Sequence, residues 1–444
     1  MKQNILLVAL LGTIASAACA QDATYDARSL GMGGAGVASA NSLNAIYQNP
    51  ATLAALPNEK FAFEIPIISI RLLDADNLQK DIDPLNQNAN ALSNALTTFQ
   101  NQLTAYQNAV AVNPAASTAA LQTSAVAAGN AINNFDGSLN TVNNKSLGGS
   151  LFGGTMIAAP RSSFSFALML DAHAEFGAKF NYDPNDSGIV TGLATAMITC
   201  GNAVGTQAQI AAACQTAGNG VGAGGKITLG PNSTTGMSIR GAMMKEVGIS
   251  VARHIDNWSD LDVGITPKFI QLTSYDYVAD AQSGNSKVTL SSGEKKDSLF
   301  TIDLGAAKTF DLNKDSAVKT GLVVKNVLPK TATTVNGNEI RIAPQLTAGV
   351  AYTRSWFTGT ADLDVLKNKA MLQGFSNDSQ YLRLGTELNA WGFAQFRLGY
   401  RHDLAGNYPD LPSVGVGLFH VFDLSVAAVG KKEAAAALQF GIRF

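Results

Sequence analysis

One motif in this sequence has the spacing of a nucleotide-binding site. Gly31, Gly33 and Gly36 match G-x-G-x-x-G, which dinucleotide-binding folds use to place backbone amides against a pyrophosphate. That chemistry requires a strand before the glycines and a helix after them, within a βαβ unit. The motif here comes so soon after the start of the chain that no such strand fits. We therefore interpret these glycines and Gly34 as positions of close backbone packing or positive φ.

Catalytic groups are scattered along the chain. The four histidines fall in separate segments, at His173, His254, His402 and His420. A hydrolase needs a serine, a histidine and a carboxylate that converge at one point, and no segment of this sequence assembles them. We expect no enzyme activity, no metal site and no cofactor.

Residues 1–20 have the features of a secretory signal peptide. A lysine and a short apolar run precede Ala18-Cys19-Ala20, which fits the small-x-small cleavage pattern and makes Gln21 the mature start. The apolar run is too short to span a membrane, which takes about 20 apolar residues. The alternative is a lipoprotein acylated on Cys19. It is disfavoured because Ser16 stands where such signals usually carry leucine.

The remaining cysteines agree with export. Cys200 and Cys214 are the only two left in the mature chain. An even pair in an oxidising compartment predicts a disulfide. The alternative, a metal or redox pair, lacks both a neighbouring histidine and C-x-x-C spacing.

The composition excludes nucleic acid as a partner. Charged residues make up 14% of the chain and the formal net charge is −2. Soluble domains typically carry about 25% charged residues. A nearly neutral chain provides no positive field to attract a phosphate backbone.

Short segments of alternating hydrophobicity recur along the chain, most clearly at its C-terminus. Leu438, Phe440, Ile442 and Phe444 fall on one face of a strand, and Gln439, Gly441 and Arg443 fall on the other. One face can contact lipid while the other lines a polar lumen. On this basis we predict fourteen strands, at 58–72, 148–160, 163–181, 236–255, 260–280, 296–311, 315–328, 341–355, 357–369, 379–390, 393–404, 410–421, 423–430 and 436–444.

The connections between these strands are alternately long and short. A closed barrel with both termini in the periplasm has that order, with short periplasmic turns and longer external loops, whereas a β-sandwich does not. Closure also leaves no strand edge exposed to lipid. The predicted fold is therefore all-β, a closed antiparallel outer-membrane β-barrel of about fourteen strands, with twelve or sixteen as alternatives. Pro267 should produce a bulge or kink in the fifth strand.

Two long inserts interrupt the barrel pattern, which occupies residues 58–444. In residues 74–146, apolar residues recur at four-three spacing on both sides of Asn113-Pro114, which predicts an antiparallel helical hairpin. This hairpin is either a helical cap packed on its own partner or an external lid or docking arm. The other insert, residues 182–235, contains both cysteines and many glycines. We expect it to be a long external loop with little regular structure.

Charged residues also occur on the polar face of neighbouring predicted strands. They are Asp362, Asp364, Arg383, Glu387, Arg397 and Arg401. We interpret them as an internal ion-pair network that fixes the register and the segment inside the barrel. The alternative is a path for polar solutes, but a selectivity ring usually carries charges of one sign.

Residues 31–54, GMGGAGVASANSLNAIYQNPATLA, resemble the N-terminal region of the FadL-like outer-membrane proteins. Within that group they are most similar to the TraF-type conjugal transfer proteins, the barrel proteins of that name and not the thioredoxin-like ones. The terminal Phe444 and GLVVKNVLP at 321–329 fit the same pattern. The resemblance implies a fourteen-stranded barrel whose lumen holds an N-terminal hatch, here residues 21–57. Asn49, Pro50 and Ala51 would be the signature of this hatch, together with the glycines at 31–36.

The resemblance also implies a location and a function. We expect the Gram-negative outer membrane, with membrane lipid around the barrel and the C-terminal strand as the signal for the barrel-assembly machinery. The implied function is a channel for hydrophobic small molecules such as fatty acids. The alternative is a structural or interaction component of a conjugal transfer or secretion apparatus, with apparatus proteins as partners.

Overall fold

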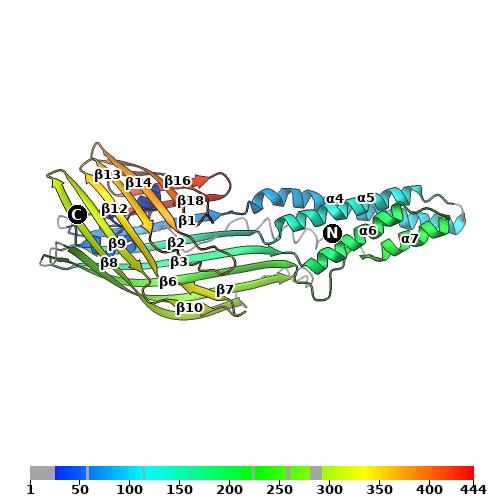
Figure 1. Ribbon diagram of the computed structural model, residues 1–444, viewed down its shortest axis with the longest axis horizontal. Coiled ribbons are helices and arrows are strands. Elements are labelled where there is room, and N and C mark those ends of the chain that lie inside the picture. The colour runs from blue at the N-terminus through cyan, green and yellow to red at the C-terminus, as the bar shows by residue number, and fades with distance from the viewer. Residues whose placement is uncertain are drawn as a thin grey trace.

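The computed structural model describes residues 26–56, 60–113, 116–161, 163–222, 226–256, 261–280 and 293–444. The expected signal peptide, the start of the mature chain at Gln21 and Pro114 lie outside these residues. In the described part, fourteen strands close into an antiparallel barrel, and a bundle of helices extends beyond one end of it (Figure 1).

Each barrel strand pairs with its neighbours in chain order, and β18 returns to β1 to close the wall. The barrel strands are β1 (Ala62–Leu73), β2 (Ser146–Ala159), β3 (Ser165–Asn181), β6 (Gly236–Ile255), β7 (Leu261–Asp280), β8 (Glu294–Asn313), β9 (Ser316–Lys325), β12 (Gln345–Arg354), β13 (Phe357–Asp364), β14 (Tyr381–Ala390), β15 (Ala394–Asp403), β16 (Leu411–Leu418), β17 (Phe422–Val429) and β18 (Glu433–Arg443). Every predicted strand overlaps one of these, so the predicted fold is confirmed.

The wall is apolar outside and polar inside. On β18, Phe440 and Ile442 are 41% and 45% exposed, whereas Gln439, which directly precedes Phe440, is 1% exposed. On β15, Leu398 is 63% exposed and the adjacent Arg397 is 4% exposed. This is the reverse of a water-soluble sheet and fits a barrel whose outer face contacts lipid.

Short turns gather at one end of the barrel and long connections at the other, as the sequence predicts. Exposed aromatic side chains mark the short-turn end: Trp356, Trp391, Phe393 and Phe419. Aromatic girdles of this kind lie at the interfaces of membrane barrels. One long connection contains a hairpin that the sequence pattern missed, formed by β10 (Lys330–Thr333) and β11 (Glu339–Ile342).

Of the bulge or kink expected at Pro267, the bulge is wrong. The pairing of β7 with β6 and with β8 has the same register on both sides of Pro267. The pairing with β6 is interrupted next to the proline, whereas the pairing with β8 includes Pro267 itself. No extra residue is inserted in the strand. Register shifts occur instead in β1, between Glu64 and Ile67, and in β8, between Asp311 and Asn313.

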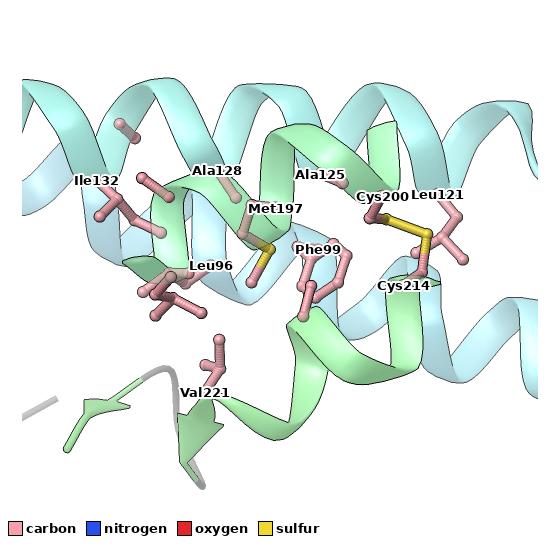
Figure 2. Close-up of a cluster of buried hydrophobic side chains, with 14 of the residues drawn as sticks. Leu96, Phe99, Leu121, Ala125, Ala128, Ile132, Met197, Cys200, Cys214 and Val221 are labelled. Atoms are coloured by element: carbon pink, nitrogen blue, oxygen red, sulfur yellow. A yellow bond between two sulfur atoms is a disulfide. The ribbon is translucent and has the colours of Figure 1, made fainter. Parts of the chain in front are cut away.

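The two inserts together build one four-helix bundle. Helices α4 (Leu78–Val112) and α5 (Ala119–Val142) occupy the insert for which a hairpin is predicted. The other insert contains α6 (Pro184–Gly201), α7 (Gln207–Asn219) and the short strands β4 (Val221–Gly222) and β5 (Lys226–Ile227). The expectation of little regular structure there is wrong. Apolar residues of all four helices meet in a common core that includes Phe99, Ile132 and Met197 (Figure 2).

Local sequence signals fix the ends of the two unexpected helices. Asp183 caps α6 by accepting from the Asn185 amide, at 2.9 Å. Hydrogen bonds from the backbone amides of Thr234 and Asn185 hold the pKa of Asp183 below its ordinary value, so the cap stays charged. At the start of α7, Thr206 and Gln209 form a capping box.

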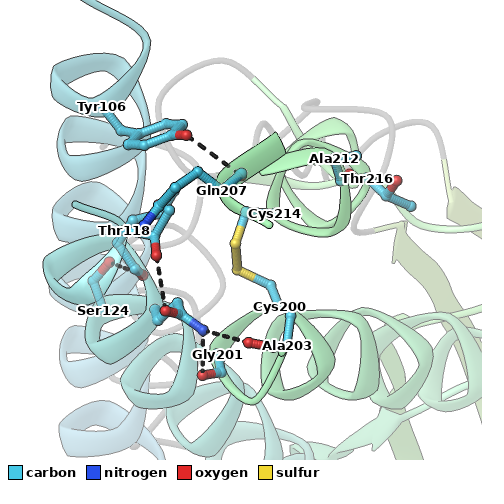
Figure 3. The surroundings of a disulfide bond; sticks show 12 residues. Tyr106, Thr118, Ser124, Cys200, Gly201, Ala203, Gln207, Ala212, Cys214 and Thr216 are labelled. Carbon is cyan, nitrogen blue, oxygen red and sulfur yellow. Dashed lines mark hydrogen bonds between the residues drawn. A yellow bond between two sulfur atoms is a disulfide. The ribbon is translucent and has the colours of Figure 1, made fainter. Parts of the chain in front are cut away.

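The two cysteines join α6 to α7 through a disulfide, Cys200–Cys214 (Figure 3). Beside it, the Gln122 side chain of α5 donates to the carbonyls of Gly201 and Ala203, at 3.3 and 2.8 Å. The far end of the bundle is therefore linked both covalently and by hydrogen bonds. Among the helices that the structure describes, none has the length and apolarity needed to cross a membrane.

Candidate functional site

The candidate site is the hatch, which we define as residues 26–56. It lies inside the barrel, is almost entirely buried, and contains α2 (Ala27–Gly31), α3 (Ala45–Gln48) and the 3-10 helix η1 (Pro50–Leu53). Asp26 organises the segment because its carboxylate caps α2, accepting from the Ser29 amide at 2.8 Å. The same carboxylate accepts from Asn44 Nδ2 at 3.1 Å and Gln48 Nε2 at 3.0 Å, which joins α2 to α3.

Asn49-Pro50-Ala51 forms the turn into η1. Asn49 Oδ1 accepts from the Ala51 amide at 3.1 Å, and Pro50 occupies the first turn, where its missing N–H costs nothing. Asn49 Nδ2 donates to the carbonyl of Val37 in the hatch and to that of Ala306 in β8, both at 3.1 Å. One side chain thus caps η1, joins two hatch segments and attaches the hatch to the wall.

The glycines of the hatch motif allow its backbone to lie directly on the wall. Gly33 and Gly34 have φ of +71° and +89°, which only glycine adopts readily. A Cβ on Gly33 would lie 2.6 Å from the backbone nitrogen of Tyr400 in β15. A Cβ on Gly31 would lie 2.6 Å from Ser425 Oγ, and one on Gly36 would meet the Gln48 side chain.

The wall supplies matching glycines on eight strands. At each of them, a Cβ would lie 3.1 Å or less from a hatch atom. We call this set the glycine belt: Gly264, Gly305, Gly321, Gly349, Gly385, Gly399, Gly415 and Gly441. Sequence reasoning missed the belt. A signal for it was present in the sequence, since glycine recurs on the polar face of several predicted strands. The contact is closest at Gly399, whose Cβ would lie 1.9 Å from Gly33 N.

An ion-pair chain fixes the hatch to one side of the lumen. Arg28 Nε and Nη2 donate to the two carboxylate oxygens of Glu387 in β14, at 3.0 and 3.1 Å, and Nη1 donates to the Ser39 carbonyl at 2.7 Å. Arg397 Nε donates to Glu387 at 2.7 Å, and its Nη1 pairs with Asp423. Buried charges with partners of opposite sign hold one geometry strongly, because each is unpaired if the other moves.

The six predicted lumenal charges divide into two groups. Three serve the hatch: Glu387 and Arg397 belong to the ion-pair chain, and Asp362 Oδ2 accepts from the amides of Gly36 and Val37 at 2.7 and 2.8 Å. The others join strands of the wall, with Arg383 paired to Asp364 at 2.7 Å and Arg401 paired to Glu433. Sequence reasoning missed Arg28, Asp423 and Glu433.

The other side of the hatch meets the wall through apolar side chains. Tyr47 and Leu53 pack in one cluster with Phe152 and Met156 of β2 and Met169 of β3. The rings of Tyr47 and Phe152 meet edge to face, with centroids 5.7 Å apart. Apolar contact is not directional, so this side lacks the geometric constraint of the ion-pair chain.

A cavity of about 60 Å³ lies between this apolar side and the wall. Its lining is mixed. Methionines and aromatic residues, among them Phe152, Met169 and Met244, share it with Glu246, Lys268 and Asp303. Lys268 Nζ pairs with Asp303 at 3.1 Å. Pockets for small organic ligands measure about 300–1,000 Å³, so the cavity is too small for such a ligand while the hatch keeps this position.

The long-connection end of the lumen is also covered. The β10–β11 hairpin contributes Ile340 and Ile342 to a buried cluster, which Met371 and Leu372 of a neighbouring connection complete. This cluster packs on the inner face of β6, β7 and β8, which extend beyond the shorter strands on the other side of the barrel. The lumen is thus closed by the hatch and by these connections.

The remaining candidate residues lie away from the hatch. Cys200 and Cys214 are in the bundle, and His402 pairs with Asp410 at the mouth of the barrel, at 2.6 Å. Within the described ranges, no group of three or more His, Cys, Asp or Glu side chains is placed to hold a metal ion. The role of β18 as an assembly signal stays a prediction.

Comparison with known proteins gives one family and several similar structures. The model of the family described as "F plasmid transfer operon, TraF, protein" matches residues 46–364. The toluene transporter TbuX of Ralstonia pickettii is 13% identical, with 95% of this chain and 98% of that chain covered and a TM-score of 0.47. For the toluene transporter TodX of Pseudomonas putida these values are 10%, 94%, 97% and 0.45. Among curated proteins, no sequence matches this chain.

Proposed function

The chain belongs to the family of F plasmid transfer operon TraF proteins, and we propose that it is an outer-membrane channel through which hydrophobic small molecules, fatty acids among them, pass the hatch. The apolar outer face and the exposed aromatic residues at the short-turn end support the membrane location. The alternation of long and short connections supports an orientation with the helical bundle outside the cell.

The unequal attachment of the hatch is the observation that carries this proposal. Glycine contacts hold it against β7 to β9 and against β12 to β18, and the Arg28–Glu387–Arg397 chain adds ion pairs on β14 and β15. Against β2 and β3 it is held largely by the packing of Tyr47 and neighbouring apolar residues. A path that opens on the apolar side breaks no buried ion pair of the hatch, so it is the less costly of the two.

The lining of the cavity suits a solute with an apolar body. Met169, Met244 and Met371 surround it, and methionine adapts its shape to irregular or varied partners. Lys268 and Lys325 also reach the cavity, beside these residues. Asp171, Glu246 and Asp303 line the same cavity, and Lys268 is paired with Asp303. The methionines and aromatic rings therefore suit the apolar body of a solute, and the charges do not favour an acidic head group.

The test is uptake of a labelled long-chain fatty acid by cells in which this protein is the only candidate carrier. We expect saturable uptake. In the double variant Tyr47→Cys/Phe152→Cys, a short cleavable bis-maleimide should tether the hatch on its apolar side. Uptake should then fall at least tenfold and return when the spacer is cleaved. Each single-cysteine variant, treated with the same reagent, is the matched control.

Two outcomes would contradict the channel. One is the absence of uptake of fatty acids and of aromatic hydrocarbons by cells whose outer membrane contains the correctly inserted protein. The other is unchanged uptake after complete tethering, which would exclude passage between Tyr47 and Phe152.

The bundle favours a second candidate function, that of an interaction component of a transfer apparatus. A channel needs no rigid structure projecting beyond the membrane, yet α4 alone has 35 residues, and the bundle has its own core and disulfide. Replacing residues 77–144 and 183–235 by short turns separates the two functions. Loss of plasmid transfer with uptake unchanged would support the apparatus function, and loss of uptake alone would support the channel.

A further inference from the structure

Three lysines line one pocket at the long-connection end of the barrel. The pocket measures about 490 Å³, which is within the range of about 300–1,000 Å³ for small organic ligands. It lies between the start of α4, the turn from β17 to β18 and the connection after β15. We call it the rim pocket, and its lining residues are Asp74, Asn77, Lys80, Pro409, Val429, Gly430, Lys431 and Lys432.

The lysines of the rim pocket are not used within the chain. Their side chains are exposed, and in the part of the chain that the structure describes none of them forms an ion pair or a side-chain hydrogen bond. Other lysines at this end of the barrel do pair, Lys145 with Asp81 at 2.5 Å and Lys369 with Asp378 at 2.7 Å. The rim pocket therefore has positive charge that the fold itself does not neutralise.

One carboxylate lines the rim pocket, and it is already bound. Asp74 accepts from the backbone amides of Leu78 and Gln79 at the start of α4, at 2.6 and 2.9 Å. A carboxylate in this position stabilises the positive end of the helix dipole. Three lysines and one aspartate give the lining a formal charge of +2. The other acidic residues of this segment lie outside the lining: Asp76, Asp81 and Asp83.

The rim pocket lies at the height of lipid head groups. Asp74 N donates to the Lys432 carbonyl at 2.7 Å, so the pairing of β1 with β18 extends to Lys432. Ala434, two residues further along, is the last exposed apolar residue of β18 before the turn. With a rise of about 3.3 Å per residue and a tilt of roughly 40°, Lys432 lies about 5 Å above Ala434. The head-group region adds about 5–8 Å on each side of the apolar layer, so the lysine side chains reach the phosphates there.

We propose that the rim pocket binds the head group of an outer-leaflet lipid that carries a phosphate monoester. A phosphate monoester has about 1.5–2 negative charges at pH 7, which matches a lining of +2. The carboxylate of a fatty acid has only one. Lysine binds phosphate as a point charge, and basic pockets at membrane interfaces bind phosphorylated head groups. The choice of leaflet rests on the proposed orientation, whereas the binding does not depend on the proposed channel.

A lipid fits the rim pocket better than free phosphate does. Pro409 and Val429 give the pocket apolar walls, and the lysine stems add methylene groups. Apolar surface does not bind an inorganic ion, but it can pack on the glycerol backbone and the first methylene groups of a lipid. Lys80 belongs to α4, and Lys431 and Lys432 belong to the turn before β18. A bound head group would therefore join the base of the helical bundle to the barrel wall at the membrane surface.

Native mass spectrometry of the full-length protein in a non-ionic detergent measures this binding. The probes are dioleoyl phosphatidate, which has the phosphate monoester, and dioleoylglycerol, which has the same acyl chains without it. We expect the first phosphatidate to bind at least tenfold more tightly than dioleoylglycerol. In Lys431→Gln/Lys432→Gln this preference should fall to within about twofold. In Lys431→Arg/Lys432→Arg it should remain, because arginine keeps the charge.

Lys330→Gln/Lys367→Gln is the matched control. Both lysines are exposed on connections at the same end of the barrel but outside the rim pocket, so this variant loses the same charge elsewhere. Its preference for phosphatidate should be unchanged. All three variants should keep the heat-modified gel mobility of the folded barrel, because the exchanged side chains are exposed.

Three results would overturn the proposal. One is equal affinity of the wild-type protein for phosphatidate and dioleoylglycerol. Another is an equal loss of preference in the control variant, which would mean that the total charge of this end attracts the lipid. The third is binding of oleate or of inorganic phosphate as tight as that of phosphatidate. Tight oleate binding would place the site on a path for solutes, and tight phosphate binding would make it a site for soluble anions. Solute uptake plays no part in this assay, so failure of the proposed channel leaves the binding result intact.

Discussion

Replacing Arg28 by methionine should loosen the hatch while keeping a side chain of similar length. The change removes two hydrogen bonds to Glu387 and one to the Ser39 carbonyl. Removing one partner of a buried ion pair costs about 3–5 kcal/mol. Glu387 keeps its bond to Arg397 at 2.7 Å, so the lower limit of about 3 kcal/mol applies. Because about 1.4 kcal/mol is a factor of ten, the displaced hatch should become roughly 150-fold more populated.

Single-channel conductance in planar bilayers measures this population, because a displaced hatch lets ions through the lumen. The wild-type protein should open rarely and Arg28→Met far more often. Arg401→Met is the matched control. Arg401 is similarly buried and pairs with Glu433 of β18, a contact within the wall. It should destabilise the barrel without opening it. Equal conductance in the two variants would refute the conclusion that the ion-pair chain holds the hatch.

Three further predictions concern the glycine belt, the disulfide and the orientation. Gly399→Ala places a Cβ 1.9 Å from Gly33 N and should make the hatch sensitive to protease, whereas Gly153→Ala, with nothing within 4 Å, should not. Replacing Cys200 and Cys214 by serine should destabilise the bundle by about 3 kcal/mol, seen as faster proteolysis of the bundle with unchanged heat-modified gel mobility of the barrel. In intact cells, a membrane-impermeant maleimide should label Val112→Cys, whose native side chain is 88% exposed. Labelling only after the outer membrane is permeabilised would reverse the orientation.

The barrel could be predicted from the sequence because the alternation that specifies a membrane strand lies within the strand itself. A strand that separates lipid from a polar lumen must alternate with period two, and segments such as 394–401 and 438–444 show this by themselves. Errors arose where one segment depends on another. The core residues of α6, such as Leu193 and Met197, lie in a glycine-rich stretch and are buried only because α4 and α5 cover them. Read alone, the segment resembles a loop.

The contacts of the hatch could not be predicted either, because they join residues that are still farther apart in the sequence. Arg28 and Glu387 are 359 positions apart, and no spacing rule connects them without the register of the barrel. The charges on the wall could be predicted because alternation assigned them to the polar face, but their partners could not. The glycine belt differs because its members were visible on the polar face of several strands, and their function became clear only when the hatch was in place.

Strand length explains why the hatch is attached unequally. The barrel strands from β9 to β17 have 8 to 10 residues, whereas β6, β7 and β8 have 20 each. Glycines let the hatch backbone touch the wall on the short strands and also at Gly264 of β7 and Gly305 of β8, but the ion pair of the hatch, Arg28–Glu387, lies on the short side. On the long side, the wall has the height to present larger side chains above the hatch, and the cavity lies there. In the channel proposed above, a solute would pass the hatch on this side by displacing the packing of Tyr47 and the hydrogen bond from Ser165 Oγ to the Leu53 carbonyl, at 3.1 Å, and it would break no ion pair of the hatch.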